Sequence, residues 1–392
     1  MVRVGLRCRI PLTMYDTPSM GIEMELWVVD EDGRLCGDHD LADAHDRIVP
    51  EFIDPLVEVQ TEPHDDVRDL EADFREVLAA AIEAAEAAGK RLVPLGTPLT
   101  AERPPANCRR GELFETIYGD GVVSAKNCAG THIHFEKSDT AQQFNLLTAL
   151  DPALALVSSS PYYLGRRRED SSRAKAYRTK CGPEFRTYCD LWSYVESVEV
   201  WDGRVERAFE AFVETAAERD VPRSTVEEYF SPANTMLNPV RIRHCQPTVE
   251  WRAPDAALPS QVLQLAADVG ELMGKLEGRS LEFGSTDVTN ERIRIPEFPK
   301  LWTLSREAIE RGLGAERVET YLRRLGLNPQ EYQPISGQIH GPATLSASEG
   351  RQLRLEYAER LRSDVEALAA GRSPRPIEPI AGVAGAEELR NL

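Results

Sequence analysis

Polar and apolar residues alternate in four stretches of the chain, a pattern that predicts β-strands with two unlike faces. The first stretch covers residues 21–29 and the second covers residues 55–61. The third covers residues 127–136, and the fourth covers residues 240–251. A shorter apolar stretch at residues 91–96 predicts one more strand.

Patterns of helical spacing separate these strands. In residues 65–88, acidic residues come first, apolar residues recur at helical spacing, and Gly89 follows as a stop signal. Similar patterns predict helices at residues 140–157, 204–219, 259–277, 301–325 and 349–370. Residues 101–126 are expected to be irregular, and residues 166–178 to form an arginine-rich loop. Long helices between strands that do not alternate in tight units predict an α+β fold, with helices packed on one side of a largely antiparallel sheet.

The four alternating stretches carry polar side chains two residues apart. In chain order these residues are Glu23, Glu25, Glu58, Gln60, Glu62, His132, His134, Glu250 and Arg252. Side chains two apart on a strand point to the same face, so each strand can turn a polar face toward a shared cavity and bury its apolar face. For any one pair, a solvent-exposed sheet face is the alternative interpretation.

Carboxylates gathered around one cavity need cations, because like charges in one place repel one another. A ligand set rich in oxygen with an occasional imidazole suits Mg²⁺ or Mn²⁺ better than structural zinc. A cage that holds two such metals is a common place for the phosphates of ATP. Strand parity puts His132 and His134 on the same face and leaves open which of them reaches a metal.

Common nucleotide and hydrolase motifs are missing from the sequence. It contains no Gly-x-x-x-x-Gly-Lys-Ser/Thr, and no Gly-x-Gly-x-x-Gly follows a predicted strand. Gly-x-Ser-x-Gly and His-Glu-x-x-His are absent as well. These absences argue against a P-loop ATPase, a Rossmann dehydrogenase, a serine hydrolase and a zincin.

Acidic residues outnumber basic residues by 65 to 46, which gives a net charge of −19. We therefore expect no binding to nucleic acid or to anionic membranes, since both need lysine and arginine. Only seven of the basic residues are lysine. This imbalance favours a halophilic, archaeal source, because salt screens repulsion and hydrated carboxylates keep a protein in solution. An ordinary acidic protein from a GC-rich genome is the alternative.

Seven cysteines are scattered along the chain without a Cys-x-x-Cys pair. The first residues lack the order of a signal peptide, and the most apolar stretch, residues 146–164, is interrupted by Asp151 and a Ser-Ser-Ser-Pro turn. We therefore expect reduced thiols, no membrane span and a cytoplasmic location. The oligomeric state is left open, with a homo-oligomer as one option.

Six motifs occur together in a fixed order. They are Gly-Ile-Glu-Met-Glu-Leu-Trp at 21–27, Val-Glu-Val-Gln-Thr-Glu-Pro at 57–63, Lys-Asn-Cys-Ala-Gly-Thr-His-Ile-His-Phe at 126–135, Ser-Ser-Pro-Tyr-Tyr-Leu-Gly at 159–165, Ser-Arg-Ala-Lys at 172–175 and Pro-Thr-Val-Glu-Trp-Arg-Ala-Pro-Asp-Ala at 247–256. Each motif is short, but the ordered set, which covers residues 20–280, resembles the glutamate–cysteine ligase type 2 family, the carboxylate–amine ligases.

The resemblance implies a fold like the catalytic domain of glutamine synthetase, in which a curved antiparallel sheet forms a funnel with helices outside. It also implies a reaction. ATP phosphorylates the side-chain carboxylate of glutamate, and an amine, typically that of cysteine, attacks the acyl phosphate to give γ-glutamylcysteine, ADP and phosphate. The expected cofactors are ATP and Mg²⁺ or Mn²⁺, and the expected partners are glutamate and cysteine or another amine.

Phosphoryl transfer between two anions depends mainly on neutralising charge. In the implied site, Arg173 and Arg252 would contact the γ-phosphate, the acyl phosphate or the glutamate carboxylate, since a planar guanidinium suits bidentate contacts. Asn127 and Glu62 are candidate contacts to the nucleotide, with a turn role as the alternative for Asn127. The expected metal ligands are Glu23, Glu25, Glu58, Glu250 and His132 or His134, with Glu58 also counted as catalytic.

The expected domains are a ligase domain at residues 1–280, a helical extension packed on it at 281–371, and a mobile tail rich in Pro, Ala and Gly at 372–392. Residues 166–173 read Arg-Arg-Arg-Glu-Asp-Ser-Ser-Arg where family members usually carry a Thr-Gly turn, and Ala257 stands where glutamine is common. These departures concern the acceptor amine more than the ATP chemistry. A ligase with a different amine, a non-catalytic metal- or nucleotide-binding relative, and a metal-dependent hydrolase that needs no ATP are the alternatives.

Overall fold

The computed structural model describes residues 17–371, apart from 38–40, 102–103, 105 and 180–184. It combines helices with a largely antiparallel sheet, so the predicted fold class is confirmed at that level. The funnel shape that the resemblance implies stays a prediction. The predicted tail at residues 372–392 lies outside the described residues.

The long strand β1 (Met20–Asp30) organises the main sheet, and the alternating stretches supply most of its neighbours. The first half of β1 pairs with β5 and the second half with β4, while β3 lies along its other edge. The strand order is β2 (Ile48–Pro50), β3 (Leu56–Gln60), β1, β5 (Thr131–Glu136), β9 (Thr248–Trp251) and β8 (Val240–Ile242), with β4 (Lys90–Val93) beside β1.

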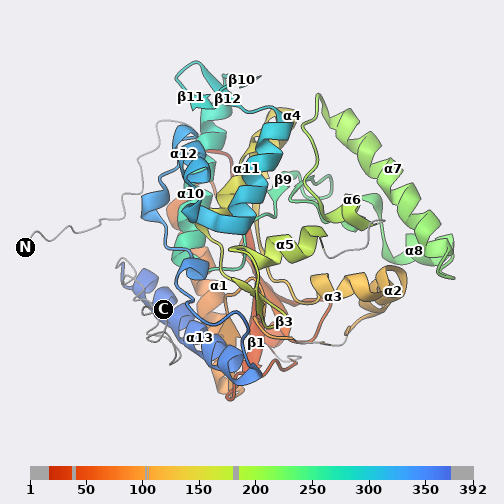
Figure 1. Cartoon of the computed structure of the whole chain (residues 1–392), viewed down its shortest axis with the longest axis vertical. Helices are drawn as coiled ribbons and strands as arrows, with labels where there is room; N and C mark the ends of the chain where they lie inside the picture. Colours follow the sequence, from red (N-terminus) through yellow and green to blue (C-terminus); the bar gives the residue numbers. More distant parts are fainter. Residues whose placement is uncertain (1–16, 38–40, 102–103, 105, 180–184, 372–392) are drawn as a thin grey trace, which may run out of the picture.

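Three helices cover the apolar face of this sheet. Ile22, Met24 and Ile133, which point to that face, are almost completely buried. Figure 1 shows the three helices on one side of β1 and β3, and each contacts at least one strand of the sheet. They are α1 (Val67–Ala87), α10 (Pro259–Leu276) and α13 (Ala347–Ala369). Burial of such apolar residues is the main favourable term in holding the layers together.

The polar face of the sheet is also covered, so the prediction of helices on one side only is wrong. Short helices lie across that face, because the charged side chains there enclose a cavity rather than meet open solvent. The helices on this side are α2 (Arg109–Tyr118), α3 (Val122–Ala125), α5 (Ser172–Thr179), α6 (Arg186–Cys189) and α9 (Pro232–Thr235), with α7 (Val198–Ala217) and α8 (Arg223–Tyr229) further out.

Three of these helices fall in segments that were predicted to be irregular or to form a loop. The segment predicted to be irregular contains α2 and α3, whose apolar pattern is short and is interrupted by Gly119 and Gly121. The segment predicted to be an arginine-rich loop contains the short strand β7 (Arg166–Arg167) and α5. The buried face of α5 includes Arg173 and Arg178, so a search for apolar periodicity could not find it.

Three predicted elements are divided in two. The predicted helix 140–157 becomes α4 (Thr140–Ala149) and a 3-10 helix, Asp151–Leu156, whose second residue is a proline and has no N–H to donate. The predicted helix 301–325 is interrupted after α11 (Phe298–Arg311) by Gly312, which adopts a positive φ of 53°. The predicted strand 240–251 is a hairpin of two short strands.

The segment at 281–371 is not helical throughout. A small sheet joins β10 (Ser280–Phe283), β12 (Arg292–Ile295) and β11 (Asp287–Val288) at its start. Two helices, α11 (Phe298–Arg311) and α12 (Glu316–Arg324), follow before α13. The domain boundary at residue 280 stays a prediction.

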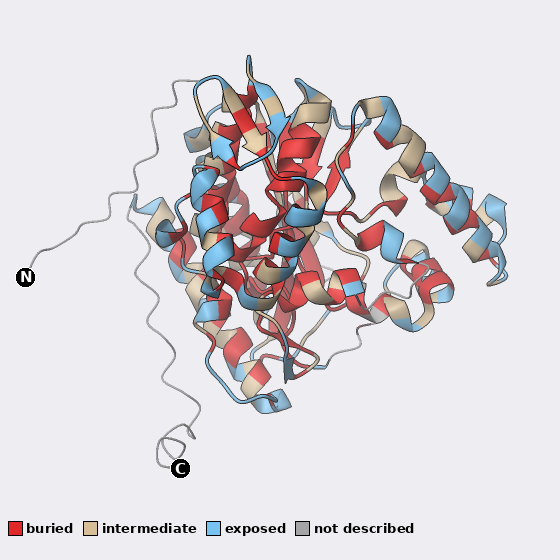
Figure 2. Cartoon of the chain, turned by 45° about the horizontal axis from the view of Figure 1, so that its top comes forward, coloured by how far each residue is buried: buried red, intermediate tan, exposed pale blue. Residues whose placement is uncertain are grey.

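Burial follows the layers: in Figure 2 the sheet is buried and the exposed residues lie mainly on the outer helices. Within the described part of the chain, we find no helix with the length and apolar character needed to cross a bilayer.

Candidate active site

A cavity of about 260 Å³ lies between the polar face of the main sheet and the helices α2, α5, α6 and α9. Carboxylates from the β1, β2 and β3 end of the sheet form one group in the lining (the carboxylate side), and arginines from β8, β9 and α5 form another (the arginine side). Arg110 of α2 also lines the cavity and acts electrostatically on Glu51, and apolar side chains surround both groups. The charged lining residues are Glu23, Glu25, Glu51, Glu58, His132, Arg110, Arg173, Arg241, Arg243 and Arg252. Six of these ten residues are among the site residues predicted from the sequence.

Strand register explains why the predicted residues meet. Glu23 lies between Gln60 on β3 and His132 on β5. Two residues further along β1, Glu25 lies opposite Glu58. In another row, His134 on β5, Glu250 on β9 and Arg241 on β8 are neighbours across the sheet. Residues two apart on each strand therefore share one face, as the alternation predicted.

The end of this face formed by β1, β2 and β3 gathers three carboxylates. Glu25 and Glu58 are cross-strand neighbours, and Glu51 follows β2 closely enough for one oxygen of each to lie within 4.8 Å of the others. Like charges placed opposite each other destabilise a sheet unless something compensates them. Burial, followed by repulsion from Glu25, raises the pKa of Glu51 to about 8. Burial and the neighbouring glutamates raise the pKa of Glu58 well above its ordinary value.

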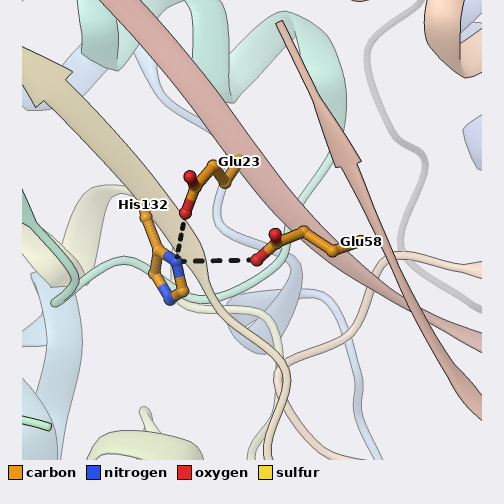
Figure 3. Close-up of side chains that lie close together, drawn as sticks. All are labelled: Glu23, Glu58 and His132. Atoms are coloured by element: carbon orange, nitrogen blue, oxygen red, sulfur yellow. Dashed lines mark hydrogen bonds and ion pairs between the residues drawn. The ribbon is translucent and has the colours of Figure 1, made fainter. Parts of the chain in front are cut away.

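A second group of ligand atoms joins Glu23, Glu58 and His132, whose side chains point toward one another in Figure 3. The His132 Nδ1 atom lies 3.2 Å from a carboxylate oxygen of Glu23 and 3.8 Å from one of Glu58. Burial raises the pKa of Glu23, but interactions with His132 and His134 outweigh this and hold it below its ordinary value. Burial and the charge of Arg252 lower the pKa of His132, which keeps the imidazole neutral.

These two groups fit divalent cations on chemical grounds. Glu25, Glu51 and Glu58 form no ion pair with a lysine or arginine among the described residues. The His132 Nε2 atom is buried and has no hydrogen-bond partner in the described part of the chain. Oxygen ligands with one neutral imidazole match the preferences of Mg²⁺ and Mn²⁺.

The other end of the face, on β8 and β9, is rich in arginine. The fully buried Glu250 carboxylate accepts two hydrogen bonds from Arg241, at 2.9 and 2.7 Å, and one from Arg252 at 2.6 Å. Arg243 lies 3.4 Å away from it. Burial opposes the ionised form, but Arg241 and Arg252 hold the pKa of Glu250 well below its ordinary value. Three arginines around one carboxylate leave this end positive.

Arg173 comes from α5, and its side chain passes over Gly130, the residue directly before β5. Its Nη1 atom donates to the carbonyl of Ala253 at 3.2 Å, and its Nε atom is buried without a hydrogen-bond partner among the described residues. A Cβ atom on Gly130 would lie 2.0 Å from Nη2, so the guanidinium passes directly over a residue that must lack a side chain. The glycine in the motif before His132 thus has a packing reason.

Several predicted site residues have other surroundings. Glu250 has ligand atoms near Glu23 and His134, yet its oxygens already accept hydrogen bonds from arginines, which competes with the predicted role as a metal ligand. His134 binds Thr248 through Nδ1 at 3.0 Å, and His132 is the histidine that lines the cavity. Glu62 is exposed and Asn127 is buried, and neither lines the cavity, so their predicted nucleotide contacts gain no support.

Sequence reasoning missed four charged residues of the cavity. Arg241 and Arg243 are two apart in Val-Arg-Ile-Arg, so the parity argument that found the glutamates could have found them. Glu51 follows a strand of three residues, and Arg110 lies in a segment predicted to be irregular. Those two positions carried no periodic signal.

Comparison with protein families now gives these observations a context. Residues 19–305 match the model of glutamate–cysteine ligase family 2, which is well over half of the chain. The chain belongs to this family. The resemblance inferred from the ordered motifs is therefore confirmed, while the halophilic archaeal origin stays a prediction.

Two relatives within the family align with part of the chain. A protein of Bordetella avium, provisionally named glutamate–cysteine ligase 2, is 30% identical over 172 residues, which is 40% of this chain and 42% of the relative. A similarly named protein of Clavibacter michiganensis is 29% identical over 179 residues, or 41% of this chain and 46% of the relative. The chain thus matches less than half of the length of these curated relatives.

Among solved structures, the bifunctional glutathione synthetase of Pasteurella multocida has a similar fold. The TM-score is 0.54 at 16% identity, and the match covers 91% of this chain and 54% of that one. At this identity the likeness concerns the fold alone.

Proposed function

We propose that the chain is an ATP-dependent carboxylate–amine ligase that joins the side-chain carboxylate of glutamate to the amine of cysteine. In the first step, a carboxylate oxygen attacks the γ-phosphorus of ATP, and ADP leaves. In the second step, the amine nitrogen attacks the acyl carbon and loses a proton, and phosphate leaves as γ-glutamylcysteine forms. Both steps bring anions together, so they depend on charge placed around the reacting atoms.

The observation that carries this proposal is the division of one cavity into a carboxylate side and an arginine side. A bound Mg²⁺ or Mn²⁺ would neutralise phosphate oxygens. Glu23, Glu58 and His132 would hold one such ion, and Glu25 and Glu51 would share Glu58 to hold another. Sites of this kind, with two metals, commonly serve phosphoryl chemistry.

The arginine side suits the anionic groups of the substrates. Arg252 and Arg173 both line the cavity, where each can contact the transferred phosphoryl group or the glutamate carboxylate. Glu250 would orient Arg241 and Arg252 through the hydrogen bonds described above, so that their guanidinium groups are in place before the substrate binds. The cytoplasmic location and the homo-oligomer remain predictions beside this proposal.

A second candidate keeps this chemistry and changes the acceptor amine. Phe52, Leu56 and Phe114 form an apolar part of the cavity wall. Such a wall accommodates the thiol side chain of cysteine, and it accommodates a small apolar amine equally well.

Release of ADP tests the proposal directly. The purified chain, in molar salt with Mg²⁺ or Mn²⁺ and glutamate, is given a panel of amines that includes cysteine, and the product is identified by mass. We expect ADP only when glutamate and an amine are both present, and cysteine as the best amine. A different amine would support the second candidate. Turnover without ATP would support a hydrolase, and nucleotide binding without ADP release would indicate a binding protein.

The variant to test beside the unaltered chain is Glu25→Ala, because the Glu25 side chain lines the carboxylate side of the cavity. This variant should abolish ADP release and leave the chain folded, because the change removes a negative charge from a crowded group rather than an apolar core residue. Unchanged ADP release would remove Glu25 from the site.

A further inference from the structure

The residues directly before Arg173 are held by the C-terminal part of the chain. The Ser171 N–H donates to the carbonyl of Ile309 in α11 at 3.0 Å. The Asp170 carboxylate accepts a hydrogen bond from the Ser336 hydroxyl at 3.0 Å. Figure 1 shows α5 beside α11, in agreement with their contacts. Two elements far along the sequence therefore hold the residues directly before α5, together with Ser160, whose carbonyl accepts a hydrogen bond from the Ser172 N–H at 2.9 Å.

The hairpin of β6 (Tyr162–Tyr163) and β7 is held in the same way. The Arg167 N–H donates to the carbonyl of Ala343 at 2.9 Å, and the Leu345 N–H donates to the carbonyl of Gly165 at 2.8 Å. The Tyr162 hydroxyl donates to the carbonyl of Pro342 at 2.7 Å. Residues 335–345 thus run along the whole loop that leads to Arg173.

Asp170 also fits closely against the end of α11. A Cβ atom on Gly312 would lie 2.0 Å from a carboxylate oxygen of Asp170, and Gly312 has a φ of +53°. Gly314, at the other end of the same 3-10 turn, has no atom within 4 Å of the position its Cβ would take. The contact is therefore specific to Gly312, and the two glycines form a matched pair for experiment.

The far end of α5 is fixed as well. Arg178 makes two hydrogen bonds to the buried carboxylate of Asp151, at 2.8 and 2.6 Å. Between these two anchored ends, the side chain of Arg173 passes over Gly130 toward the carbonyls that follow β9. A small shift at the start of α5 would move that guanidinium within the cavity.

We propose that Asp170 is a positioning residue, through which the C-terminal segment sets the place of Arg173 in the cavity. This inference rests on the proposed function, in which Arg173 contacts the reacting groups. It gives residues 309–345 a role in the reaction, although none of them lines the cavity. Asp170 acts only through α5, so its effect on the reaction should depend on Arg173.

A double-mutant cycle tests that dependence. We expect Asp170→Ala to lower kcat for ADP release by about tenfold or more, with little change in KM for ATP, because misplacing a group that acts in the transition state affects the chemical step. In an Arg173→Lys background the same change should have an effect of less than about twofold. An equal loss in both backgrounds would overturn the proposal. Asp170→Asn, which keeps an oxygen for Ser336, should restore most of the activity.

Hydrogen exchange tests the coupling between the C-terminal segment and α5 without any turnover of substrate. In Gly312→Ala, the amides of residues 171–179 should exchange faster than in Gly314→Ala, while exchange of the main sheet stays the same. Equal exchange in the two variants would contradict the coupling. If the unaltered chain releases no ADP under any condition, the proposed function fails, while hydrogen exchange still decides whether the C-terminal segment controls α5.

Discussion

The two ends of the polar sheet face are built from the same alternation, yet they differ in charge balance. At the end formed by β1, β2 and β3, Glu25, Glu51 and Glu58 come together and form no ion pair with a lysine or arginine among the described residues, although Arg110 and Arg252 act on Glu51 from further away. At the end formed by β8 and β9, three arginines surround the single carboxylate of Glu250. One end is short of cations, and the other has cations to spare.

This difference indicates which end of the sheet face needs a bound cation. Buried like charges must bind protons or metal ions, so the carboxylate end is complete only with a cation. The arginine end is neutralised in part by Glu250 and is ready for an anion. In the proposed ligase, a substrate that carries both a metal ion and a phosphate would bridge the two ends.

The largest expected effect on the free energy of unfolding is that of Glu250→Gln at the arginine end. Removing one partner from a buried ion-pair network costs roughly 3–5 kcal/mol, because the remaining charges stay buried without compensation. Unfolding in denaturant should show this loss. Glu136→Gln is the matched control, since Glu136 is exposed on β5, and it should change the free energy of unfolding by less than about 0.5 kcal/mol. Similar losses in the two variants would contradict a special role for Glu250.

Glu58→Gln breaks the carboxylate end, and its effect should be on activity rather than stability. We expect ADP release to fall by roughly 100- to 1,000-fold, as for the loss of one strong electrostatic contact in a transition state. The thermal midpoint of the metal-free chain should stay the same or rise, because repulsion with Glu25 and Glu51 is relieved. A large drop in that midpoint would mean that Glu58 is structural.

Gly130→Ala tests how firmly Arg173 is held, because the Arg173 guanidinium passes over Gly130 on its way to the cavity. Its Cβ would overlap the guanidinium, so we expect a loss of about 1–3 kcal/mol in the free energy of unfolding, together with reduced ADP release. Gly21→Ala is the control, since the nearest atom to its Cβ would be 3.7 Å away. Wild-type behaviour of Gly130→Ala would show that Arg173 can move aside at no cost.

A pH dependence of the metal-free chain is also expected. Burial raises the pKa of Glu51 to about 8, so the folded chain holds this proton more tightly than the unfolded chain does. Its stability contribution is complete below the ordinary pKa near 4.5 and is lost as the pH rises toward 8. The thermal midpoint should therefore fall between pH 5 and pH 8, and Mg²⁺ or Glu51→Gln should flatten that decline. A midpoint that rises over this range would contradict the assignment.

The sequence predicted the sheet well because alternation fixes which side chains share a face. Glu23, Glu25, Glu58 and His132 share one face for that reason. The strand register, which decides which of them lie opposite one another, could not be predicted from the sequence. The helix α5 was missed because its buried face carries Arg173 and Arg178 instead of apolar residues. Glu51 and Arg110 reach the cavity through tertiary packing, which leaves no pattern in the local sequence.

ATP binding in the presence and absence of a divalent cation tests whether the carboxylate end holds the nucleotide through a metal ion. Calorimetric titration of the purified chain should give tight binding with Mn²⁺, and binding at least about tenfold weaker with EDTA, since the carboxylate end alone repels phosphates. Equal affinity in Mn²⁺ and in EDTA would contradict the account, because the carboxylate end would then play no part in holding the nucleotide.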